Sequence, residues 1–100
     1  MMRKPGDSSA LTDLPNLGKE AVRLLAAVGI TTPDDLRRVG AVAAARRIRE
    51  LRPADPPCRS MLAGLEGAIR GVHWHAIPKA EREGLWQEYA LRTDQDRSRT

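Results

Sequence analysis

The sequence has few aromatic residues, no phenylalanine and a single cysteine. Aromatic side chains make up 3% of the 100 residues, so leucine, alanine, valine and isoleucine must build most of any core. Cys58 alone cannot form an internal disulfide or an all-cysteine metal site, and it fits a reducing cytoplasm. No stretch of several residues alternates cleanly between apolar and polar side chains, so we expect little or no β-sheet.

Long apolar runs and catalytic patterns are missing as well. No run approaches the ~20 residues of a membrane span, and the N-terminus lacks the apolar segment of a secretory signal. These absences predict a cytoplasmic protein with no membrane partner. The sequence has no glycine-rich phosphate loop, no paired acid and base and no Ser/His/Asp arrangement, so we predict no enzyme and no cofactor. His73 and His75 lack further ligands nearby, which favours a structural role around Trp74 over a metal site. We expect Trp74 itself to fill the core where two helices meet.

Helix-forming residues dominate what is present. A length of 100 residues and an apolar fraction of 41% suit one small domain. We predict an all-α fold, a compact five-helix domain over residues 11–91, with a flexible leader at 1–10 and a disordered tail at 92–100. The expected helices span 19–28, 33–39, 41–51, 58–70 and 79–91.

Local signals place the ends and faces of these helices. Thr32 is a good N-cap with a proline directly after it, and Gly29 is suited to end the first helix. Ala26 and Leu51 are expected on the buried faces of their helices, from apolar spacing. The glycines at 64 and 67 weaken a helix, and this predicts that another helix approaches closely there.

The segment Leu14-Pro15-Asn16-Leu17-Gly18 resembles the turn of the helix-hairpin-helix family. In that family, backbone N–H groups at such a turn face a nucleic-acid phosphate. Here the resemblance implies that the amides of Leu17, Gly18, Lys19 and Glu20 face the phosphate, with Lys19 and Arg23 as added charges. Asn16 replaces the first glycine of the motif, which places a side chain where a phosphate would approach.

A second group of cations belongs to the same hypothesis. The formal charge of +4 permits binding to nucleic acid. The candidate electrostatic surface consists of Arg37, Arg38, Arg46, Arg47, Arg49 and Arg52. The alternative is that these arginines form a solvated helix face, diluted by nearby acidic residues. No aromatic residues alternate with them, so base stacking is not expected.

Several segments together resemble the C-terminal domain of the TfoX/Sxy competence regulators. The hairpin, Val28-Gly29-Ile30, Gly40-Ala41-Val42 and above all Leu65-Glu66-Gly67-Ala68-Ile69-Arg70-Gly71 with His73-Trp74 carry the resemblance. It implies a compact helical domain of the helix-hairpin-helix or SAM-like kind, in bacterial cytoplasmic proteins that regulate DNA-uptake genes. About ten residues precede the matching part, so we expect the N-terminal domain of two-domain members to be missing.

Three functions follow from these observations. The first is a non-enzymatic binding module that contacts a protein partner in a transcription or DNA-handling complex. The second is direct, sequence-independent binding of duplex DNA through the hairpin and the arginines. The third is self-association as a homodimer, through the glycine-lined helix or through the face that carries Trp86 and Tyr89. The sequence contains no feature that names the partner.

Overall fold

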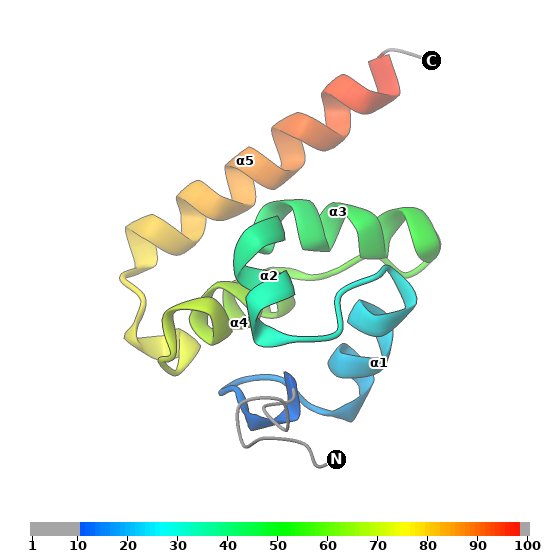
Figure 1. The fold of residues 1–100 in the computed structure, drawn as a ribbon. Coiled ribbons are helices and arrows are strands. Elements are labelled where there is room, and N and C mark those ends of the chain that lie inside the picture. Colours follow the sequence, from blue (N-terminus) through cyan, green and yellow to red (C-terminus); the bar gives the residue numbers. More distant parts are fainter. Residues whose placement is uncertain (1–10, 99–100) are drawn as a thin grey trace.

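A computed structural model describes residues 11–98, which form five α-helices and two short 3-10 turns without a β-strand (Figure 1). The elements in chain order are η1 (Leu11–Asp13), α1 (Lys19–Ala27), α2 (Pro33–Val39), α3 (Ala41–Leu51), α4 (Arg59–Arg70), η2 (Trp74–Ala76) and α5 (Lys79–Ser98). The predicted all-α class and the five helices are confirmed. The leader predicted at 1–10 lies outside the described residues.

The core lies where α1 to α4 meet, beneath α5. Its fully buried side chains include Leu25 of α1, Leu36 of α2, Ile48 of α3 and Leu65 of α4. Helices α3 and α4 pack against each other, and α5 packs on both and extends past them at its C-terminal end (Figure 1). This arrangement leaves the hairpin before α1 on the opposite side of the domain from the C-terminal end of α5 (Figure 1).

The capping residues, proline and glycines place the helix starts and ends where the sequence predicted them. The Thr32 hydroxyl accepts a hydrogen bond from the backbone N–H of Asp35 over 3.0 Å and caps α2, with Pro33 at the first helical position. Gly29 and Gly40 take φ values of 87° and 90° at the two turns that follow α1 and α2. Such values favour glycine because it has no Cβ.

Three details of the helices differ from the predictions. Ala26 is exposed, although apolar spacing predicted it on the buried face of α1 that Leu24 and Leu25 form. Leu51 is 48% exposed, since it is the last residue of α3 and lies beyond the packed turns. Helix α5 does not end near Leu91, and its backbone is helical to Ser98, where a tail without structure was expected. No glycine or proline interrupts residues 85–98.

Candidate functional site

The hairpin before α1 turns at a residue whose backbone has the left-handed conformation. The N–H of Leu14 donates to the carbonyl of Leu11 over 3.0 Å, and Asn16 then reverses the chain with φ of 74°. Asn is one of the few residues other than glycine that tolerates this conformation. Gly18 has φ of −97° and ψ of −175°, so its backbone is extended. It is the N-cap of α1 and makes no side-chain capping bond.

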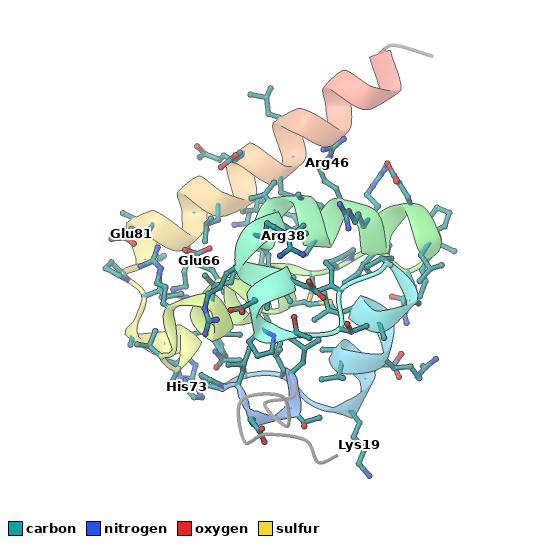
Figure 2. The ribbon with its side chains drawn as sticks, in the orientation of Figure 1. Lys19, Arg38, Arg46, Glu66, His73 and Glu81 are labelled. Carbon is teal, nitrogen blue, oxygen red and sulfur yellow. The ribbon has the colours of Figure 1, made fainter. Side chains whose placement is uncertain are left out.

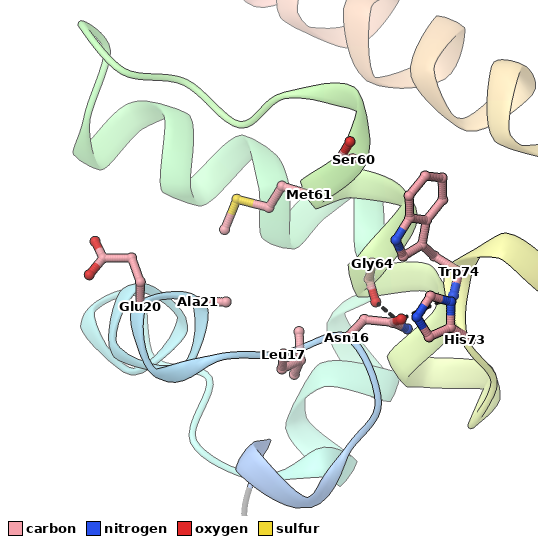
Figure 3. Close-up of a pocket in the computed structure, with 9 residues that line it drawn as sticks. All are labelled: Asn16, Leu17, Glu20, Ala21, Ser60, Met61, Gly64, His73 and Trp74. Carbon is pink, nitrogen blue, oxygen red and sulfur yellow. Dashed lines mark hydrogen bonds between the residues drawn. The ribbon is translucent and has the colours of Figure 1, made fainter.

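The side chain of Asn16 is directed into the domain. Its amide nitrogen donates to the carbonyls of Val72 over 2.9 Å and of Gly64 over 3.4 Å, and its oxygen accepts the N–H of Trp74 over 3.0 Å. Figure 3 shows this side chain lying between Gly64 and the His73–Trp74 segment. Asn16 therefore joins the hairpin to α4 and η2. The expectation that its side chain would meet a phosphate was wrong, because three backbone groups of the domain hold it.

Two glycines of α4 make room for this contact. A Cβ at Gly64 would lie 3.4 Å from the Cβ of Asn16. A Cβ at Gly67 would lie 2.5 Å from the amide nitrogen of Asn16 and 2.7 Å from the carbonyl oxygen of Val72. The predicted close approach at these glycines is real, but the approaching groups are the hairpin and the segment after α4. They are not another helix.

A pocket of about 400 Å³ opens beside the hairpin, where the first turns of α1 and α4 face η2 (Figure 3). Its lining residues are Asn16, Leu17, Glu20, Ala21, Ser60, Met61, Gly64, His73 and Trp74. Leu17 and Met61 are half-buried and pack against the core. Both helices begin without a side-chain cap. The pocket thus combines apolar walls with a few polar groups, as ligand and peptide sites do.

Trp74 separates this pocket from a second hollow of about 140 Å³. Arg59, Ser60, Ala63, Trp74, Arg82 and Glu83 line the second hollow. Trp74 is half-buried in η2 and lies at the surface, so it does not fill the core between two helices as predicted. The guanidinium carbon of Arg82 lies 5.2 Å from the centre of the Trp74 ring, within the range of a cation–π contact.

The hairpin cations differ in their surroundings. Arg23 pairs with one carboxylate oxygen of Glu20 over 2.6 Å, and Arg52 pairs with the other over 3.0 Å. The Arg23 guanidinium lowers the pKa of Glu20, and Arg52 adds to this effect. Lys19 is exposed, and no ion pair with a residue of the described range involves it. Figure 2 shows Lys19 pointing away from the molecule.

The arginines of α2 are paired with acidic residues of the same helix. Arg37 binds Asp34 over 2.9 Å and Arg38 binds Asp35 over 2.6 Å. The backbone N–H of Thr31 donates to Asp35 over 3.1 Å, and this bond, with Arg38, lowers the pKa of Asp35 from 3.8 to about 2. Their charges are therefore balanced locally, as the alternative of a solvated face implied.

The arginines of α3 do not form one surface with the hairpin. Arg47 donates to the carbonyl of Val28 over 3.3 Å. Arg46 points from α3 toward α5, away from Lys19 (Figure 2). Arg49 lies close enough to Tyr89 of α5 to act on its phenol electrostatically. Lys19, Arg38 and Arg46 thus lie on different parts of the domain (Figure 2), whereas Arg52, directly after α3, reaches Glu20 beside Arg23.

The two faces predicted for self-association make contacts within the domain. Tyr89 is 5% exposed and belongs to the core, and Trp86 packs against that core with Arg59 over its ring at 4.9 Å. Gly64 and Gly67 are buried beneath Asn16. Gly64 and Gly67 are thus covered by the hairpin, Trp86 stays half-buried, and self-association remains a prediction.

The described part of the chain holds neither a metal-binding cluster nor a membrane-spanning helix. Within residues 11–98, no three side chains of His, Cys, Asp or Glu gather in a way that would hold a metal ion. The rings of His73 and His75 lie 4.7 Å apart beside Trp74, and Nδ1 of His73 accepts the backbone N–H of His75 over 3.4 Å. No helix in the described range has the length and apolar character needed to cross a bilayer.

Ser60 and Met61 are the pocket residues that the sequence reasoning missed. Their neighbour Trp74 was noticed only as a core residue. A usable signal exists in the sequence, because Asn16 stands at a glycine position of its motif and two small residues lie three apart in the later helix. That combination indicates that a side chain of the hairpin docks on α4.

Comparisons with known proteins agree with this architecture. The family model described as the TfoX C-terminal domain matches residues 7–89. A crystal structure of an uncharacterized protein from Listeria monocytogenes, in a triclinic form, is 38% identical, with a TM-score of 0.74 over 80% of this chain and 89% of that one. A structure of a Listeria monocytogenes protein of unknown function, in a tetragonal form, is 37% identical, with a TM-score of 0.74 over 81% and 96% of the two chains. No curated protein matches the chain.

Proposed function

Because the chain belongs to the TfoX C-terminal domain family, we propose that it is a non-enzymatic binding module that contacts a protein partner in a bacterial transcription or DNA-handling complex. We place this complex in the cytoplasm and, as the resemblance to competence regulators implies, in the control of DNA-uptake genes. The proposed contact surface is the pocket beside the hairpin and the residues around it.

One observation supports protein contact over DNA contact. The arginines expected to meet phosphates at the hairpin and on α2 already face carboxylates of this chain: Arg23 with Glu20, Arg37 with Asp34 and Arg38 with Asp35. Phosphate contacts would require breaking these pairs and bringing a polyanion close to acidic residues. The apolar pocket beside Leu17, Met61 and Trp74 needs no such rearrangement to accept a protein side chain.

The second candidate is direct duplex binding at the hairpin. Lys19 and the uncapped start of α1 support it, because the inward side chain of Asn16 leaves the outer side of the turn to its backbone. Such binding releases counterions and must weaken steeply with salt.

The two functions are separated by partner capture and duplex binding with the full chain. The immobilised chain is expected to retain a specific host protein after nuclease digestion, and a fluorescent duplex is expected to show no saturable binding at about 50 mM salt. Loss of the captured protein on nuclease treatment, together with duplex binding that Lys19→Glu weakens, would replace the protein-contact proposal with the DNA one. The control Arg37→Glu makes the same change of charge on α2, away from the hairpin.

A further inference from the structure

Resting on the proposed function, we infer that the partner docks through an acidic segment that carries one large apolar side chain. The docking surface is the pair of hollows on either side of Trp74, here called the Trp74 groove, defined by Leu17, Ser60, Met61, Trp74 and Arg82. The apolar side chain enters the larger hollow, and acidic residues flank it.

The size and walls of the larger hollow fit an apolar anchor. A volume of about 400 Å³ is at the lower end of that of small-molecule pockets and is ample for one leucine or aromatic side chain. Leu17 and Met61 supply aliphatic walls and Trp74 a ring. An anchor of this kind, surrounded by a polar rim, is the usual centre of a protein interface.

The charges around the groove favour an acidic partner. Glu20 is the one charged residue that lines the larger hollow, and Arg23 and Arg52 each hold one of its oxygens. In the smaller hollow, Arg59 and Glu83 pair with each other over 2.6 Å.

Arg82 supplies the uncompensated charge. Its Nε donates to the carbonyl of Ile77 over 3.0 Å and its guanidinium lies over Trp74. No carboxylate in the described part of the chain pairs with Arg82. It thus keeps donors for a partner's carboxylate in the smaller hollow, beside Trp74, which lines both hollows.

Other occupants fit less well. A second copy of this chain carries the same net charge of +4, which opposes its docking at a positive surface. A DNA backbone supplies negative charge but no apolar group for the hollow beside Leu17 and Met61. An acidic segment with an apolar anchor satisfies both features.

The test uses NMR spectra of the full chain titrated with short synthetic peptides. One set has a central Leu, Phe or Trp between Asp and Glu residues, and the matched set has Lys in place of the acids. The acidic set is expected to shift the indole N–H of Trp74 and the amide of Gly64, and to leave the amide of Gly29 unchanged. The lysine set is expected to bind at least about tenfold more weakly.

Two variants locate the site. Arg82→Gln is expected to weaken the acidic peptides about tenfold, whereas the control Arg37→Gln on α2 changes their affinity less than about twofold. Ser60→Trp fills both hollows from an exposed position and is expected to abolish binding without disturbing the core. Three results with the peptides would overturn the inference: no binding by the acidic set, equal binding of the two sets, or binding unaffected by Ser60→Trp. It would also be overturned by a DNA duplex that shifts the same resonances, or by concentration-dependent dimerisation that Ser60→Trp blocks.

The outcome is separable from that of the proposed function. A captured host protein that resists nuclease and is neither displaced by acidic peptides nor lost with Ser60→Trp leaves the module function standing and refutes the Trp74 groove as its docking site. Absence of any captured protein, with salt-sensitive duplex binding, refutes the module function itself.

Discussion

The backbone N–H of Trp74 donates a hydrogen bond to the side-chain oxygen of Asn16 over 3.0 Å. The two residues stand 58 positions apart in the chain, and this bond helps to fix the groove wall to the hairpin. The amide nitrogen of Asn16 binds Val72 and Gly64 in the same place, so one side chain satisfies three backbone groups. The stability of the domain and the shape of its candidate site therefore depend on the same contact.

Asn16→Asp tests that contact with little change of shape. The substitution keeps an acceptor for Trp74 and tolerance of positive φ, but it sets a carboxylate oxygen against the carbonyls of Val72 and Gly64. We expect a loss of about 2–3 kcal/mol in the free energy of unfolding, measured by urea denaturation at neutral pH. A stability equal to that of the unsubstituted chain would show that the two donor bonds of Asn16 contribute nothing.

Gly67→Ala is expected to destabilise the domain by about 1–3 kcal/mol through overpacking against Asn16 and Val72. The matched control is Gly84→Ala in α5, where a Cβ meets nothing within 4 Å. There the change is expected to stabilise by about 0.5–1 kcal/mol, because alanine is the better helix former. Both values come from denaturant curves of the purified chains, and the same sign for both variants would contradict the packing explanation.

The lowered pKa of the Asp35 carboxyl predicts that the domain loses stability at low pH. Its pKa is lowered from 3.8 to about 2 by the Thr31 amide and Arg38, so its contribution is present above pH 4. That contribution is lost as the pH falls toward 2, because protonation ends the favourable interactions. Thermal unfolding followed between pH 5 and pH 2 should show a shallower acid decline for Asp35→Asn. Parallel curves for the two proteins would place the decline on other groups.

Ile48 and Leu51 lie one turn apart on α3 and differ in burial. Ile48 is 1% exposed and Leu51 is 48% exposed. Ile48→Ala is therefore expected to cost about 2–5 kcal/mol of unfolding free energy, and Leu51→Ala less than about 0.5 kcal/mol. Denaturation of both variants measures the difference directly. A large loss from Leu51→Ala would instead support the face that apolar spacing alone predicts.

Much of the fold could be predicted because helix ends are local features. Thr32 caps α2 through a bond to a residue three positions later, and Gly29 turns the chain with its own backbone. Neither depends on distant contacts. The prediction for α1 was wrong at Ala26, because apolar spacing places this residue beside the buried Leu25. Only packing against the other helices shows that the edge of the buried face excludes it.

The candidate site was predicted less well than the fold. The hairpin and its Lys19 were identified from the motif, and the groove beside it was missed. Trp74 was assigned to the core because large aromatic residues are usually buried. Its real position depends on Asn16 and Arg82, which come from two segments on either side of it in the chain. The pair of Arg23 with Glu20 is local, but Arg52 binds the other oxygen of Glu20 from a separate element, which local spacing does not predict.

The helical class, the helix ends and the positive φ of Asn16 in the hairpin could all be predicted from the amino-acid sequence. The physical reason is that capping residues, prolines, glycines and Asn16 act through their own backbone and their near neighbours. Only the packed domain shows where the Asn16 side chain points, why a Cβ at Gly67 would not fit, that Arg52 reaches Glu20 and that Trp74 lines an open groove. These features depend on groups that are far apart in the chain and meet only when α1, α4 and α5 pack. The hairpin is thus a local structure whose role in the site is set by its distant contacts.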